Sequence, residues 1–284
     1  MPNFNSRKAI LAAGILSGLV GAAVGPMLAA EPGRSTPDFS SNNAAWVLAN
    51  GDYIPVPGGG PGPTRNDPAH PYVTNNVFRS TGAQPTFRVA DLTNPNIKPW
   101  AKEVMKRENG KVLSGGIPYG ARASCMPAGV PAFMAFGVVE PIHFMQTPKQ
   151  VTMIFSGDAQ VRRVYLDVPH SPNPKPSWYG ESVGHYEGDT LVVDTVGMND
   201  KTYLDNFRTP HTEKLHVVER YKLVDGGKTL QVTFRVEDAD TFYEPWSAIN
   251  NFTRVQMPMH EEACAENNQH LFDYRIPIAD KPDF

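Results

Sequence analysis

The chain has 284 residues, a length within reach of one β-rich domain, and 40% of its residues are hydrophobic, which is enough for a folded core. Its formal net charge is only −3, so it lacks the excess of Lys and Arg that a nucleic-acid-binding domain needs. The 27 prolines and 24 glycines favour many turns and few long helices.

The N-terminal residues 1–30 have the layout of a secretory signal peptide. The positive charges of Arg7 and Lys8 come before a long apolar run, and small residues precede Glu31. A retained membrane anchor is the alternative, but several glycines and a proline disfavour one continuous spanning helix. We therefore predict cleavage near Glu31 and a periplasmic or secreted mature protein without stable membrane insertion.

A Pro- and Gly-rich segment at 31–97 is predicted to be extended around the domain, with one strand at 45–48. A short helix is predicted over 99–108, because Pro99 suits a first helical turn and apolar residues follow at helical spacing. Asn-Gly at 109–110 is expected to end this helix.

From about residue 133 onward, apolar and polar residues tend to alternate, as they do in half-buried strands. Turn-forming Gly, Asp and Asn residues separate the alternating segments into consecutive hairpins. The strands are expected at 151–155, 161–168, 182–186, 190–195, 215–224, 230–237 and 247–256.

The order of these strands predicts the fold class. No helical crossover separates them, as a parallel pair would require, so we expect an antiparallel meander. Closing such a sheet removes its exposed edges. Residues 98–284 are therefore predicted to form a mainly β domain, a lipocalin- or calycin-like barrel or strongly curled sheet, and a β-sandwich is the alternative.

The two cysteines, Cys125 and Cys264, are far apart in the sequence. Export would place them where disulfides persist, so we predict that they pair. In the chain-entropy model such a long loop gains about 4–5 kcal/mol of stability, less any strain. A reactive thiol or a metal ligand is the alternative, although only His260 lies near either cysteine at zinc-like spacing.

Residues 178–195 have the sequence WYGESVGHYEGDTLVVDT, and they occur together with the stretches at 94–100, 125–131 and 209–221. These stretches resemble a large family of exported, mostly uncharacterised proteobacterial and acidobacterial proteins with a GESVGHYEGDTLVVDT-type motif. The resemblance covers most of the mature chain and implies export and a general fold, but no catalytic residues. Many relatives have Arg-Trp at positions 185–186, so substrate choice would differ within the family if these side chains face a ligand.

Histidines and carboxylates interleaved with apolar strand residues are the first candidates for acid–base chemistry. Leaving such groups buried and unpaired would cost several kcal/mol, so we expect them to pair inside the barrel. A structural hydrogen-bond network is the alternative. The predicted site residues, which we expect to line a cavity, are His216, Asp194, Arg220, Tyr186 and His185, with Arg220 binding an anionic group of the ligand.

A metal site is suggested by His211, Glu213, His216 and Glu219, which are of types that bind zinc or iron. On a strand, however, His216 would point to the opposite face from the other three. We therefore predict no metal site. Glu219 and Arg220 are instead expected to form cross-strand ion pairs.

Other catalytic signatures are absent from the sequence. Gly180, Ser182 and Gly184 match a G-x-S-x-G pattern, but no helix is expected after them, as a nucleophile elbow requires. No phosphate-binding or dinucleotide fingerprint is present, so no cofactor is predicted. The leading prediction is a cofactor-independent lyase, isomerase or hydratase acting on an apolar or aromatic small molecule in the barrel. The alternatives are a periplasmic carrier of a small hydrophobic ligand and a structural envelope protein.

Overall fold

The computed structural model describes residues 36–40, 43–73, 81, 86–121, 125–135, 141–157 and 160–259. All of them lie in the compact unit Arg34–Phe284. The strands are β1 (Ala44–Leu48), β2 (Ile54–Pro55), β3 (Ile142–Thr147), β4 (Gln150–Phe155), β5 (Gln160–Leu166), β6 (Glu181–Glu187), β7 (Thr190–Val196), β8 (His216–Val224), β9 (Thr229–Glu237) and β10 (Trp246–Gln256); the helices are α2 (Pro99–Leu113) and the 3₁₀ turns η3 (Ala132–Met134) and η5 (Asp225–Gly227).

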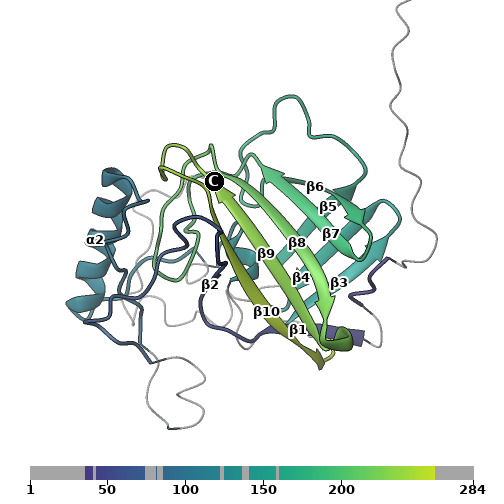
Figure 1. Cartoon of the computed structure of the whole chain (residues 1–284), viewed down its shortest axis with the longest axis horizontal. Coiled ribbons are helices and arrows are strands. Elements are labelled where there is room, and N and C mark those ends of the chain that lie inside the picture. The colour runs from purple at the N-terminus through teal and green to yellow at the C-terminus, as the bar shows by residue number, and fades with distance from the viewer. Residues whose placement is uncertain are drawn as a thin grey trace, which may run out of the picture. The chain divides into compact units, whose positions relative to one another are not determined.

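The strands close into a barrel (Figure 1). They follow the order β1-β3-β4-β5-β6-β7-β8-β9-β10, and β10 pairs back with β1 along the whole length of β1. The short strand β2 joins β10 from outside this ring. The predicted mainly β barrel is therefore confirmed, and the β-sandwich alternative is wrong.

One neighbouring pair departs from the predicted antiparallel meander. β5 and β6 run parallel, whereas the other paired strands are antiparallel. A parallel pair needs a long connection that returns the chain to the same end of the sheet. Residues 167–180 supply it without any helix, so this connection has no helical pattern in the sequence that would have predicted a parallel pair.

The β8–β9 hairpin confirms a turn predicted from its residues. Asp225, Gly226 and Gly227 all have positive φ angles, of 52°, 66° and 83°. Two successive glycines adopt this left-handed backbone without the steric cost that a Cβ atom would impose. The turn fixes the register in which Val224 faces Thr229.

The inward apolar side chains of the barrel belong to one hydrophobic core. On β9, Leu230, Val232, Phe234 and Val236 are all completely buried, as their alternation with polar residues predicts. Trp46 of β1 and Trp246 of β10 belong to the same cluster. Apolar burial of about 25 cal/mol per Å² is the main force that closes such a barrel.

The extended N-terminal segment contributes to this core. β1 pairs with β3 as well as β10, so the predicted boundary at residue 98 does not separate it from the barrel. The predicted signal peptide, residues 1–30, lies outside the described residues. Among the residues that are described, no helix is both long and apolar enough to cross a membrane.

α2 lies beside the barrel (Figure 1) and is longer than predicted. It continues through Asn109 and Gly110 because the Asn109 side chain is held by the backbone of Ala90. Asn109 Oδ1 accepts from the Ala90 N–H at 2.9 Å, and Asn109 Nδ2 donates to the Ala90 carbonyl at 2.9 Å. This buried tertiary contact outweighs the turn preference of an Asn-Gly pair.

Candidate functional site

Three of the predicted site residues, Asp194, His216 and Arg220, lie on the outer face of the barrel. Thr195 of β7 and Glu219 of β8 are completely buried, and they alternate along their strands with Asp194 and Arg220. The side chain of Asp194 is 42% exposed and that of Arg220 is 45% exposed. The prediction that these three residues point into a cavity is therefore wrong. Residues 190–193 are buried on both faces of β7, so alternation in the sequence did not reveal which face is the inner one.

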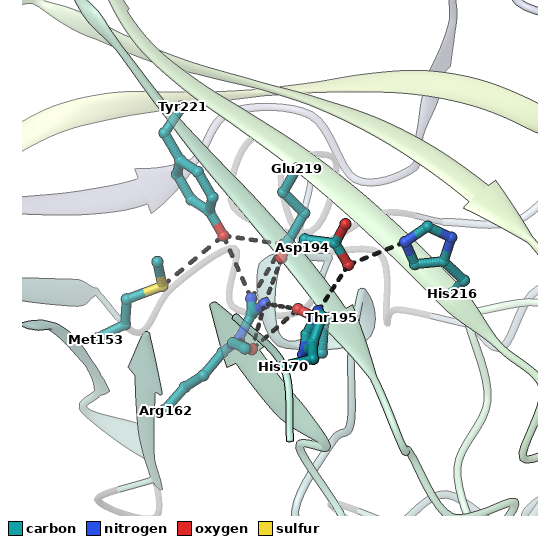
Figure 2. A network of polar contacts seen from close by, with 9 residues as sticks. Met153, Arg162, His170, Asp194, Thr195, His216, Glu219 and Tyr221 are labelled. Carbon is teal, nitrogen blue, oxygen red and sulfur yellow. Dashed lines mark hydrogen bonds and ion pairs between the residues drawn. The ribbon is translucent and has the colours of Figure 1, made fainter. Parts of the chain in front are cut away.

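The predicted pairing of Asp194 with His216 is nevertheless present (Figure 2). Asp194 Oδ1 accepts from Nε2 of His216 at 2.9 Å and from Nε2 of His170, in the 167–180 connection, at 3.1 Å. His170 Nδ1 also contacts Glu181 Oε1 at 3.0 Å. His170 therefore links the carboxylates of Asp194 and Glu181 through its two ring nitrogens. We call Asp194, His170 and His216 the outer cluster.

The remaining predicted residues do not join the outer cluster. His185 Nε2 and Arg220 Nη2 both contact the Glu187 carboxylate, at 3.1 Å and 2.5 Å, on the exposed surface. Tyr186 is half-buried, packs against the core and accepts a hydrogen bond from Gln146 Nε2 at 2.9 Å. The five predicted residues therefore form no single site.

The barrel interior holds a second polar network, centred on Arg162 and Glu219 (Figure 2). Both side chains are 0% exposed, and the Arg162 guanidinium donates from both terminal nitrogens to the Glu219 carboxylate. Thr195 Oγ1 accepts from Arg162 Nη2 at 3.0 Å, and Tyr221 donates to Glu219 Oε1 at 2.9 Å. Burial and the nearby Glu219 charge raise the pKa of Tyr221 well above its ordinary value. Glu219 therefore forms an ion pair, but with Arg162 of β5 across the barrel interior and not with a neighbouring strand, as was predicted.

The proposed metal ligands do not converge. His211 is buried, with Nδ1 donating to the Thr212 carbonyl at 3.1 Å and Nε2 contacting Thr202 Oγ1 at 2.9 Å, and burial lowers its pKa. Glu213 is exposed, and His216 lies on the outer face. In the described part of the chain, no group of three or more His, Cys, Asp or Glu side chains is arranged to hold a metal ion.

A pocket of about 420 Å³ lies among the loops, and none of its lining residues belongs to a barrel strand. We call it the loop pocket. Its walls come from the segment before α2, the segment after α2, residue 128, and the connection between β7 and β8. The lining residues are Thr86, Phe87, Arg88, Ile117, Pro118, Tyr119, Gly120, Ala121, Ala128, Tyr203, Asp205, Asn206 and Arg208.

Asp205 holds the β7–β8 connection in shape. Its Oδ1 accepts from the backbone N–H groups of Phe207 at 2.8 Å and Thr209 at 3.2 Å, and its Oδ2 accepts from the Thr209 hydroxyl at 2.7 Å. An aspartate that bonds the backbone two residues further on is a common turn former. The sequence Asp-x-Phe-x-Thr at 205–209 is the pattern from which this turn could have been predicted.

The same Asp205 carboxyl is poised for proton exchange. Burial raises its pKa to about 6, against the opposing effect of the hydrogen bonds from Thr209 and Phe207, and the Asp52 charge raises it further. Tyr203, also in the pocket wall, has its pKa raised to about 12 by burial and stays neutral. A carboxyl with a pKa close to neutrality can both accept and release protons under ordinary conditions.

A second hollow, of about 810 Å³, lies along the ends of β1, β3 and β10. Exposed methionines, including Met145 and Met257, form part of its wall. No Asp, Glu, Lys or Arg is among its described lining residues. The loop pocket is therefore the better candidate for chemistry.

The predicted disulfide involves the region beside the loop pocket. Cys125 lies between the lining residues Ala121 and Ala128 in the sequence, and the next residue, Met126, donates its backbone N–H to the Ala121 carbonyl at 2.9 Å. Cys264 lies outside the described residues, so the pairing stays a prediction.

Comparison of the chain with protein-family models, curated proteins and solved structures found no match. The resemblance to the exported family with the GESVGHYEGDTLVVDT-type motif therefore stays a prediction.

Proposed function

We propose that the loop pocket binds an apolar or aromatic small molecule and that the protein is an exported, cofactor-independent enzyme of the lyase, isomerase or hydratase type. Asp205 would be the acid–base group. The observation that carries this proposal is a buried carboxyl, with its pKa raised to about 6, in the wall of a pocket of about 420 Å³. Export rests on the sequence of residues 1–30 and on the resemblance to an exported family.

The pocket has the composition expected for small-molecule binding. Ligand pockets are mostly apolar, with a few polar groups that fix orientation. Here Phe87, Ile117 and Pro118 supply apolar surface, and the rings of Tyr119 and Tyr203 meet edge to face with centroids 6.4 Å apart. An aromatic ligand would find ring partners on more than one wall.

Asp205 would act as the base in its ionised form, which dominates at neutral pH when the pKa is about 6. The proton it takes up is then held at the carboxyl until the product receives it. The Thr209 hydroxyl contacts both Asp205 Oδ2 and Thr64 Oγ1, each at 2.7 Å, and can adjust its hydrogen bond to either protonation state of Asp205.

A carrier without catalysis is a second candidate for the same pocket. The hydrogen bonds from Phe207 and Thr209 give Asp205 a structural task in the turn, which would explain its burial without any chemistry. In that case the ligand would bind in the loop pocket and leave unchanged.

The experiment uses the mature protein in D₂O with a panel of enolisable aromatic compounds, among them phenylpyruvate and phenylacetone. Binding is followed by shifts of the Tyr119 and Tyr203 resonances, and proton abstraction by deuterium incorporation into the compound. Asp205→Asn keeps an oxygen for the backbone N–H groups, so we expect it to bind the compound but to lose the exchange. Asp189→Asn, at a surface carboxylate paired with Lys222, is the matched control and should keep both.

Each outcome of this experiment decides between the candidates. Binding with no exchange for any compound would favour the carrier. Exchange that persists in Asp205→Asn would remove Asp205 from the chemistry. No binding by any member of the panel would contradict a ligand site for aromatic compounds in the loop pocket.

The outer cluster is a second candidate for the acid–base group, because two imidazoles contact one carboxylate oxygen there. His216→Ala in the same assay tests it. Loss of exchange with an unchanged thermal midpoint would assign the chemistry to the outer cluster, and unchanged exchange would leave it to Asp205.

A further inference from the structure

Arg208 is a buried cation without an anionic partner. The residue is 5% exposed, and it lines the loop pocket. Its Nη1 donates to the Asn206 carbonyl at 3.2 Å and its Nη2 donates to the Arg88 carbonyl. Its Nε has no hydrogen-bond partner among the described residues. Backbone carbonyls satisfy two of its nitrogens, but no carboxylate of the described chain forms an ion pair with it.

Burying the Arg208 charge in this way lowers the stability of the folded protein unless a counter-ion offsets the loss of hydration. A guanidinium stays charged at any ordinary pH, and burying an ion without a partner costs several kcal/mol. Burial accordingly lowers the pKa of Arg208, although the charges of Asp205 and Glu108 oppose that effect. Arg88, on the neighbouring wall, has a partner of its own, since its Nε lies 2.5 Å from Asp52 Oδ1. Among the described residues, Arg208 is therefore the arginine of the pocket that forms no ion pair with a carboxylate, although the charge of Asp205 acts on it from further away.

We infer that the ligand of the loop pocket is an aromatic carboxylate and that the guanidinium of Arg208 binds its carboxylate group. This inference rests on the proposed function, because it names the class of molecule that the pocket takes. The charge of Arg208 selects the anion, while Phe87, Tyr119 and Tyr203 line the space for the ring. Guanidinium–carboxylate pairs are among the strongest hydrogen-bonded contacts in proteins.

Binding of such an anion is coupled to the protonation of Asp205. The charged or titratable groups that interact with Asp205 are Asp52, Arg208 and the neutral Tyr53, and Asp52 is itself paired with Arg88. A bound carboxylate adds a negative charge to the pocket that already contains Asp205, so it favours the protonated form of that residue. The affinity for an aromatic carboxylate should therefore fall as the pH rises through about 6, and the affinity for a neutral analogue should change little.

The test compares benzoate with benzamide, its neutral analogue, as probes of the full mature protein by nuclear magnetic resonance titration. We expect benzoate to bind at least about ten-fold more tightly than benzamide and to shift the resonances of residues 203–208. Arg208→Met should abolish that preference, and Arg208→Lys should retain part of it. Arg220→Met, at an exposed arginine paired with Glu187, is the matched control and should leave both affinities unchanged.

The outcomes separate this inference from the proposed function. Equal binding of the two probes would overturn the aromatic carboxylate but leave a ligand site in the loop pocket. Failure of both probes to bind would overturn both. If Arg208→Met does not fold, the wild-type protein still decides, because a benzoate affinity that does not fall between about pH 5 and about pH 7 contradicts the inference.

Discussion

Two buried arginines show how differently the barrel interior and the loop pocket are built. Arg162, inside the barrel, donates to the Glu219 carboxylate and to the hydroxyls of Ser182 and Thr195. Among the described residues, Arg208 of the loop pocket donates hydrogen bonds only to backbone carbonyls, and its Nε is unpaired. A buried charge whose partners are all present stabilises one arrangement of the chain. A buried charge that has no counter-ion in the protein favours a ligand that supplies the opposite charge.

The two arginines have different partners because one lies on a strand and the other in an irregular connection. Arg162 lies on β5, where the ladders to β4 and β6 fix its direction and bring it to Glu219 of β8. Arg208 has a positive φ of 61° in an irregular connection, where only local hydrogen bonds and burial determine its position. Loops on a rigid scaffold often carry binding residues for this reason.

The largest expected effect comes from breaking the inner pair. Glu219→Ala leaves the Arg162 guanidinium buried without a counter-ion, and we expect it to lower the free energy of unfolding by about 3–5 kcal/mol. Urea denaturation followed by circular dichroism measures this loss.

The double variant Arg162→Met with Glu219→Leu is the control, because it removes both charges at once. It should recover most of the lost stability, since Ser182 and Thr195 remain hydrogen-bonded to each other at 2.9 Å. If Glu219→Ala alone costs less than about 1 kcal/mol, the inner network does not stabilise the barrel.

A smaller effect is expected from the titration of Asp205. Its pKa is raised from 3.8 to about 6 in the folded state, so between these values the folded protein holds a proton that the unfolded chain has released. Stability therefore falls as the pH rises through this window, by about 3 kcal/mol for a shift of about two pH units. Asp205→Asn removes this dependence, so its stability relative to wild type should rise by that amount from about pH 4 to about pH 7.

Urea denaturation at a series of pH values measures this difference. Asp189→Asn serves as the control, and its curve should stay parallel to that of the wild type. A parallel curve for Asp205→Asn would mean that Asp205 titrates alike in the folded and unfolded states.

The smallest effect is expected on the outer face. The side chains of His216 and Asp194 are both partly exposed, so solvent and salt screen their interaction. His216→Ala should lower the free energy of unfolding by less than about 1 kcal/mol, and high salt should reduce the effect further. A loss comparable to that of Glu219→Ala would show that the outer cluster also holds the barrel together.

The residues of the strands largely predicted the fold. The alternating residues of β9 and the Asp-Gly-Gly turn before it predicted a hairpin that the structure contains. The parallel step from β5 to β6 was not predicted, because residues 167–180 make a crossover without a helical pattern. The end of α2 was misplaced because the contact between Asn109 and Ala90 joins segments that local preference does not connect.

The candidate site was harder to predict than the fold. The sequence by itself determined the barrel, since period-two alternation and turn residues act over a few neighbours, and it indicated that Asp194 and His216 pair. Only the tertiary structure decided that this pair faces outward, because the direction of a strand residue depends on which sheet face the rest of the chain covers. It also decided that Arg162 pairs with Glu219 and that Arg208 forms no ion pair with a carboxylate of the described residues. Segments far apart in sequence surround both arginines, and the cost of burying a charge depends on all of those neighbours at once.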